Sequence, residues 1–153
     1  MLTKSISTIA LLAISLAAAA ADGDNDKPVR FLVLGNQGSY VIESVELKWQ
    51  AEGDKSGNKG SKTFNYAIKD YEALCVDLGK VDGLHEGDEV WLIAHIALGE
   101  TESCRKSNKR IYDPNGRMQY YKMGGQTRSN NRCKISDSLG AKYGVTHGNS
   151  NGC

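Results

Sequence analysis

Short apolar segments that alternate between two faces, separated by glycine-rich turns, limit this chain to β-structure. The clearest segment is 41–50, VIESVELKWQ, in which valine, leucine and tryptophan alternate with serine, glutamate and lysine. This period of two places the apolar side chains on one face of a half-buried strand. Further strands are predicted over 28–34, 62–68, 73–78 and 88–98.

The spacing of these segments predicts the fold class. Segment 88–98 is apolar on both faces, which indicates a central strand covered on both sides. Segment 68–79 has partial helical spacing and indicates at most a short helix, while 52–61 and 144–153 are predicted to be an irregular loop and tail. Strands separated by frequent turn clusters predict an all-β, single-domain antiparallel β-sandwich, with a small β-barrel as the alternative.

The first residues are typical of a secretory signal peptide. Lys4 precedes the apolar run 9–16, and small alanines follow before Asp22. The apolar run is shorter than the roughly 20 residues of a membrane-spanning helix. We therefore expect residues 1–21 to be a signal peptide, 22–153 to be one secreted domain, and no transmembrane segment to be present.

Four cysteines in a secreted chain predict two disulfides. We expect Cys104 to pair with Cys133, because they bracket a predicted hairpin, which leaves Cys75 to pair with Cys153. A free or intermolecular Cys153 is the alternative if the tail is disordered. Cysteine and histidine spacing match no zinc pattern. No metal or cofactor is indicated.

The stretch 109–133, KRIYDPNGRMQYYKMGGQTRSNNRC, is basic, aromatic and turn-forming. Its DPNG segment is typical of a type I turn, with Gly116 expected to take a positive φ. We therefore predict a hairpin from Lys109 to Met123, followed by a flexible loop over 124–132.

Charge is segregated along the chain. Residues 104–134 hold nine basic residues and one acidic residue, a net charge of +8, whereas residues 22–103 hold 16 acidic and eight basic residues, a net charge of −8. One interpretation is that the hairpin lies across the acidic part and exposed ion pairs cancel its charge. The other is that it presents an electropositive surface to phosphate, sulfate or carboxylate groups. Contacts between copies of the chain are a third.

The second interpretation leads to our functional prediction: a secreted, lectin-like, non-enzymatic recognition module for an anionic extracellular glycan or lipid. The compartment favours these ligands over nucleic acid, and no protein partner is identified. The predicted ligand-binding residues are basic or aromatic members of the stretch: Lys109, Arg110, Tyr112, Arg117, Tyr120, Tyr121, Lys122, Arg128 and Arg132.

Catalytic signals are sparse, and no catalytic residue is assigned. The histidines are His85, His95 and His147, and His95, on an apolar strand, is expected to be a hydrogen-bonded core residue. The acidic run 82–89 is expected to be a solvated loop, although paired carboxylates would suit a glycosidase. The alternatives are a secreted hydrolase of a polyanionic polymer, of ribonuclease or glycosidase type, and a secreted inhibitor or structural protein.

Overall fold

Nearly all the regular structure is β-strand in residues 27–53, 57–105 and 110–153, which the computed structural model describes. The predicted signal peptide lies outside these residues. Within them, no helix is long and apolar enough to cross a membrane. The strands are β1 (Lys27–Asn36), β2 (Ile42–Ala51), β3 (Lys59–Phe64), β4 (Glu72–Asp77), β5 (Asp88–Ile96), β6 (Thr101–Ser103), β7 (Arg110–Tyr112), β8 (Arg117–Gln126), β9 (Ser129–Ser136) and β10 (Gly144–Gly148), with a 3₁₀ turn η1 (Leu78–Lys80).

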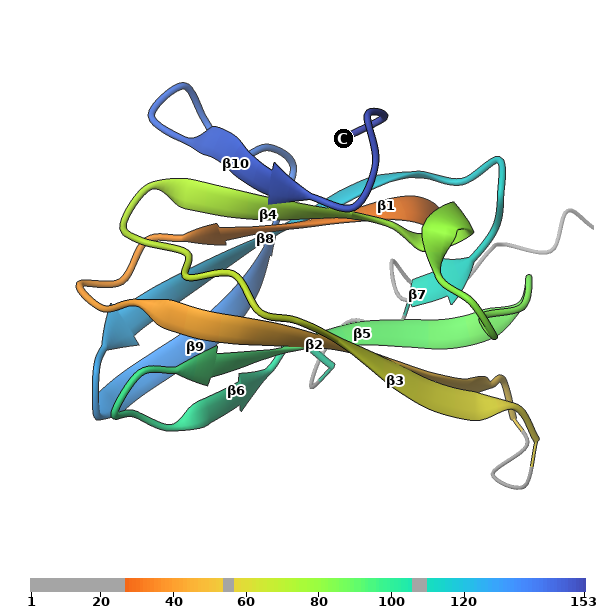
Figure 1. The fold of residues 1–153 in the computed structure, drawn as a ribbon, viewed down its shortest axis with the longest axis horizontal. Helices are drawn as coiled ribbons and strands as arrows, with labels where there is room; N and C mark the ends of the chain where they lie inside the picture. The colour runs from red at the N-terminus through yellow and green to blue at the C-terminus, as the bar shows by residue number, and fades with distance from the viewer. Residues whose placement is uncertain (1–26, 54–56, 106–109) are drawn as a thin grey trace, which may run out of the picture.

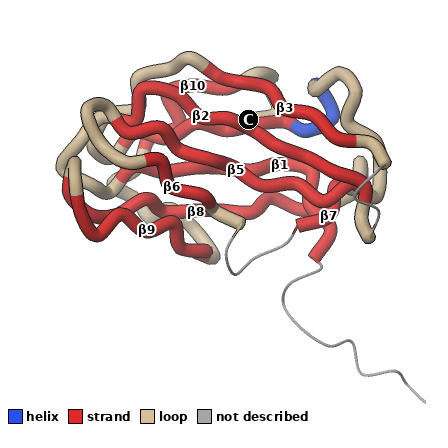
Figure 2. The backbone as a smooth tube through the Cα atoms, turned by 90° about the horizontal axis from the view of Figure 1, so that it is seen from below, coloured by secondary structure: helices blue, strands red, loops and turns tan. Residues whose placement is uncertain are grey.

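The strands form two layers, which confirms the predicted β-sandwich class (Figure 1). One layer has the order β10-β4-β1-β8-β9, and the other has β3-β2-β5-β6. Strand β7 pairs with β1 of the first layer and β5 of the second, so it joins them at one end (Figure 2). The sheet is open, unlike a barrel. Its pairings are mixed, because β1 runs parallel to β7 and β8, and β10 runs parallel to β4.

The core lies between the layers. As the alternation in segment 41–50 predicted, Val45, Leu47 and Trp49 of β2 are buried there, opposite Leu32 and Leu34 of β1. Burying one such side chain contributes about 1.5 to 3 kcal/mol. This row of contacts fixes the register of both layers and therefore decides which residues face outward.

Strand β5 is central, as predicted, but it ends at Ile96 and not at residue 98, and the prediction that both faces are covered is wrong for the outer face, where His95 is partly exposed. It pairs with β2 on one side and with β6 and β7 on the other. On its outer face, the guanidinium of Arg105 lies 4.1 Å from the ring centre of Trp91. The same guanidinium donates hydrogen bonds of 3.0 and 3.1 Å to Glu89, so this ion pair covers the tryptophan.

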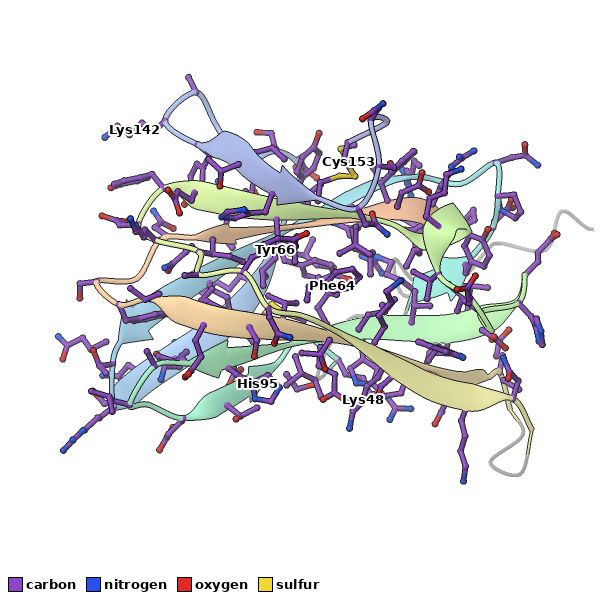
Figure 3. The ribbon with its side chains drawn as sticks, viewed as in Figure 1. Lys48, Phe64, Tyr66, His95, Lys142 and Cys153 are labelled. Atoms are coloured by element: carbon purple, nitrogen blue, oxygen red, sulfur yellow. A yellow bond between two sulfur atoms is a disulfide. The ribbon has the colours of Figure 1, made fainter. Side chains whose placement is uncertain are left out.

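The C-terminal segment covers the outer face of the first layer. Leu139, Tyr143 and Cys153 pack on Val33 and Cys75, and the Cys75–Cys153 disulfide is formed, as predicted (Figure 3). The prediction of an irregular tail over 144–153 is wrong, because residues 144–148 form β10. The possible helix over 68–79 is also wrong, since most of that segment is β4.

Two other predicted boundaries differ from the structure. The predicted strand over 62–68 ends at Phe64, and Ile68 forms only an isolated bridge with Ile42. The same strand begins earlier than expected, at Lys59, so the predicted loop over 52–61 is shorter. Both differences follow from antiparallel pairing with β2, which extends through Lys59 and stops after Phe64.

The predicted hairpin from Lys109 to Met123 is wrong, although its turn exists. The N–H of Gly116 donates to the carbonyl of Asp113 over 2.8 Å. Strands β7 and β8 do not pair with each other; both run parallel to β1, one after the other. Gly116 does not have a positive φ; a Cβ atom there would lie 2.5 Å from the carbonyl carbon of Val29. Glycine is required for this close approach to the backbone of β1.

The hairpin that does form joins β8 to β9 through a short turn at Thr127 and Arg128. The predicted flexible loop over 124–132 is therefore wrong, since most of it is strand. The Cys104–Cys133 disulfide is formed as predicted, and it ties β9 to the residue that follows β6.

Candidate functional site: the outer face of the β8–β9 hairpin

The predicted binding residues do not form one surface. Lys109 lies outside the described residues. Arg110, Tyr112 and Tyr121 are buried. The remaining five are at least partly exposed, but they are spread along β8 and β9: Arg117 at one end, Tyr120 and Lys122 in the middle, and Arg128 and Arg132 near the hairpin turn.

Arg110 and Tyr121 belong to the interior. Arg110 is 1% exposed, and its Nε donates a 2.9 Å hydrogen bond to Oε1 of Gln119. Burial raises the pKa of Tyr121 to about 12, against a smaller lowering effect of the Arg110 charge. The tyrosine hydroxyl has no hydrogen-bond partner among the described residues. These two side chains therefore lie in the interior of the fold and away from the outer face of the hairpin.

Tyr121→Phe is expected to reduce the loss of stability at alkaline pH. Above pH 10 the tyrosine ionises first in the unfolded chain, so the wild-type free energy of unfolding falls by up to about 2 to 3 kcal/mol as pH rises to about 12. The variant gives up no hydrogen bond to a described residue and keeps its stability at neutral pH. Urea unfolding between pH 8 and 12 measures this, with the surface variant Tyr66→Phe as control. If Tyr121→Phe and Tyr66→Phe lost the same free energy of unfolding at alkaline pH, the raised pKa would not belong to Tyr121.

Three cations gather on the outer face of the hairpin. Lys122 of β8 stands directly opposite Lys134 of β9, and Arg132 stands opposite Gly124, the next outward-facing position of β8. Directly opposed residues of an antiparallel pair point to the same side, so the three side chains share one face. None of them forms an ion pair with a described residue.

A hollow of about 380 Å³ lies among these cations, within the usual size of a ligand site. We call it the basic hollow. The register of β8 against β9 shifts between Gly124 and Gln126, where Gly125 has φ 124° and Asn130 of the facing strand has φ 58°. The absence of a side chain at Gly124, where a Cβ atom would meet nothing within 4 Å, leaves the space open. The lining residues are Gln37, Lys122, Gly124, Gly125, Asn130, Arg132, Lys134, Ile135 and Ser136.

The loop after β1 supplies one wall of the basic hollow, and a buried side chain holds it. The amide of Asn36 donates to the carbonyl oxygens of Tyr40 and Ile68 over 2.7 and 3.0 Å, and its own oxygen accepts from the N–H of Gly38. The N–H of Gln37 donates to the carbonyl of Met123 over 2.7 Å. Gln37 is thus held beside β8 by its own backbone hydrogen bond and by the bonds of the buried Asn36 side chain.

Aromatic side chains adjoin the basic hollow. The Lys122 ammonium lies 5.7 Å from the ring centre of Tyr143, and that ring meets Tyr71 edge-on at 5.5 Å. The Lys142 ammonium lies 5.8 Å from the ring centre of Tyr71. Burial raises the pKa of Tyr143, and Tyr71 and the nearby carboxylate of Asp70 raise it further. Two contacting aromatic rings, Tyr143 and Tyr71, therefore lie between two cations, Lys122 and Lys142.

Only a small part of the segregated charge is paired within the fold. Arg105 of the basic stretch is paired with Glu89, which is buried, whereas the Arg30–Asp77 pair, at 3.4 Å, lies entirely within the acidic part of the chain. The cations around the basic hollow, by contrast, lie on the outer face away from these pairs.

The possible catalytic groups are dispersed. The prediction of a core position for His95 is wrong: its side chain is 38% exposed on the outer face of β5, 3.8 Å from Glu46 (Figure 3). His147 stacks on Tyr66. The acidic run 82–89 is not wholly solvated, because Asp88 and Glu89 are buried at the start of β5. No group of three or more possible metal ligands occurs within the part of the chain that the structure describes.

Sequence reasoning missed Lys134, Gln37, Tyr71 and Tyr143 as members of the site. Lys134 had a signal, because it lies in the same basic stretch, one alternation from Arg132. Gln37 and Tyr71 come from segments far from that stretch, while Tyr143 follows it, and the pairing of β1 with β4 and β8 and of β4 with β10 brings the three residues together.

Comparison with known proteins places the chain in no family. No family model matches it, and no curated protein does. Among solved structures, the membrane-binding domain of pneumolysin is 11% identical with a TM-score of 0.36, over 71% of this chain and 96% of that one. The human-specific toxin intermedilysin is 11% identical with a TM-score of 0.35, over 69% of this chain and 22% of that one. The chain thus spans less than a quarter of the whole toxin.

Proposed function

We propose that this protein is a secreted, non-enzymatic recognition module that binds anionic groups of extracellular glycans or lipids in the basic hollow. The observation that carries the proposal is the grouping of Lys122, Arg132 and Lys134 on one face, around an open hollow, without ion pairs to described residues. A sulfate, phosphate or carboxylate is the complementary ligand.

Electrostatics supports an anionic ligand. Like charges directly opposite each other across a strand pair destabilise the pair, and Lys122 and Lys134 are in this position. An anion between them removes the repulsion. Arg132 adds a planar group that binds two oxygens of an oxyanion at once. Because the site is exposed, salt is expected to weaken binding.

Two further observations support the extracellular setting. The N-terminal residues have the pattern of a signal peptide. Both disulfides are formed, and such bonds persist in oxidising compartments. An extracellular module meets anionic glycans and lipid headgroups at cell surfaces.

Removing two of the cations is expected to abolish most of the binding. We expect Arg132→Ala with Lys134→Ala to lower the affinity for a sulfated polysaccharide, or for phosphatidylserine vesicles, by about 30-fold at low salt, since each cation near an anionic surface contributes about 1 kcal/mol. Surface plasmon resonance at two salt concentrations measures this. Lys80→Ala, an exposed cation on η1, is the matched control.

A second variant tests the hollow itself. A side chain at Gly124 would meet no atom within 4 Å of its Cβ, so Gly124→Leu fills the hollow without straining the fold. It should lower affinity without any change of charge. Wild-type affinity in both the charge variant and Gly124→Leu would refute the proposal, as would cleavage of RNA or of the polysaccharide by the purified protein.

A further inference from the structure

A second hollow of about 210 Å³ lies beside the basic hollow and shares Gln37 and Lys122 with it. We call it the aromatic hollow. Its other lining residues come from the turn before β4 and the segment before β10: Tyr71, Leu139, Gly140, Ala141, Lys142 and Tyr143. The two hollows therefore share the ammonium of Lys122 and the amide of Gln37. Beyond this border, the basic hollow has Arg132 and Lys134, and the aromatic hollow has Lys142.

The aromatic hollow is built on close packing. A Cβ atom at Gly35 would lie 2.8 Å from side-chain atoms of Leu139 and Tyr143, so both side chains rest directly on the backbone of β1. The Tyr143 hydroxyl is buried and has no hydrogen-bond partner among the described residues. This ring forms the fixed floor of the hollow, with Lys122 at its edge.

Tyr71, whose ring contacts this floor, has an unfavourable backbone conformation. Its φ is 61°, a left-handed conformation that costs a non-glycine residue about 1 to 2 kcal/mol. Its N–H donates to the carbonyl of Asn36 over 2.8 Å, and its carbonyl accepts from the N–H of Gly144 over 3.1 Å. Hydrogen bonds on both sides hold this conformation. Tyr71 is therefore held at the aromatic hollow as a residue that is 38% exposed.

Resting on the proposed function, we infer that the two hollows together bind an acidic oligosaccharide of at least two sugar residues. One anionic substituent lies in the basic hollow between Arg132 and Lys134, and the neighbouring sugar ring lies against Tyr71 in the aromatic hollow. Lys122, at the border, contacts the anionic groups of both sugars.

The chemistry of the aromatic hollow favours a sugar over a lipid headgroup. The face of an aromatic ring packs on the C–H face of a sugar ring, and this contact buries apolar surface. A phosphate group makes no such apolar contact. The Gln37 amide has both a donor and an acceptor for sugar hydroxyls. Lys142, beside Tyr71, matches a second acidic substituent. A phosphatidylserine headgroup would need only the basic hollow.

The experiment compares two ligands on three variants. Binding of a sulfated, uronic-acid-containing tetrasaccharide is measured by isothermal titration calorimetry, and binding of phosphatidylserine vesicles by co-sedimentation. Tyr71→Asn removes the ring, and asparagine tolerates a left-handed φ, so the variant is expected to fold. Tyr71→Phe keeps the ring. Arg132→Ala with Lys134→Ala removes the cations of the basic hollow.

We expect Tyr71→Asn to lower tetrasaccharide affinity about five- to tenfold and to leave vesicle binding unchanged, while Tyr71→Phe stays within twofold of wild type. Thermal unfolding confirms that each variant is folded. If only the Arg132 and Lys134 variant loses tetrasaccharide binding, the inference is wrong and the proposed function stands. An equal loss of vesicle binding in Tyr71→Asn also overturns it. If no variant affects either ligand, both proposals fail.

Discussion

Replacing Cys75 and Cys153 with alanine is expected to lower the free energy of unfolding by about 4.5 kcal/mol. This disulfide spans 78 residues, and a cross-link stabilises by restricting the unfolded chain, more so for a longer loop. Without the bond, the C-terminal segment is no longer held at the outer face of β4, against which Cys153 packs. Urea unfolding with linear extrapolation measures the change.

The second disulfide is the matched comparison. Cys104 and Cys133 are 29 residues apart, so alanine at both positions should cost less, about 3.6 kcal/mol. The two pairs also differ in location, since only the first secures the segment that carries Tyr143. A greater loss from the shorter loop would contradict the expected order.

Gly116→Ala is expected to cost about 3 kcal/mol. The added Cβ would lie within 2.7 Å of three backbone atoms of Val29, and a backbone cannot move aside as a side chain can. The turn between β7 and β8 must then shift away from β1, which weakens both parallel pairings. Chemical unfolding measures the loss.

Gly124→Ala is the control for this substitution, because its Cβ meets nothing within 4 Å. Its stability should stay within about 0.5 kcal/mol of wild type, as is usual for surface changes. If the two variants were equally stable, the close approach of Gly116 to β1 would be refuted.

Local patterns predicted the strands well where one face is buried. Alternation in segment 41–50 located β2 to within one residue at each end, and the two apolar faces of segment 88–98 correctly indicated a central strand. The cysteine pairing was also predicted correctly, although the hairpin from which it was inferred does not form. For the two strands, the deciding constraint is the spacing of apolar residues, which lies within the segment itself.

Choice of strand partner was not predictable in the same way. The DPNG segment has the chemistry of a hairpin turn, and a turn does form, but the strands on either side pair with β1, which lies about 80 residues earlier in the chain. Similarly, the sequence GVTHG has no apolar alternation, and its strand forms because Cys153 and β4 hold it in place. Local residues set the turn, and distant ones set the pairing.

The candidate site was predictable only in part, because local residues do not determine strand partners. Lys122 and Arg132 were identified from the basic stretch. Three of the nine predicted binding residues are buried because alternation along β8, and the position of β7 between the layers, turn them inward. Tyr71 enters the site only through the turn that follows from pairing β4 with β1.

The two layers are held along one edge by bonds of different chemical kinds. At one end β7 hydrogen-bonds to both layers, and at the other Cys104–Cys133 links the residue after β6 to β9, whose only strand partner among the described residues is β8. Only the second connection depends on the redox state of the surroundings. In a reducing compartment the hairpin that carries the basic hollow would therefore loosen before the core does. Thus the same oxidising environment that forms the disulfide also makes the outer face of the hairpin rigid.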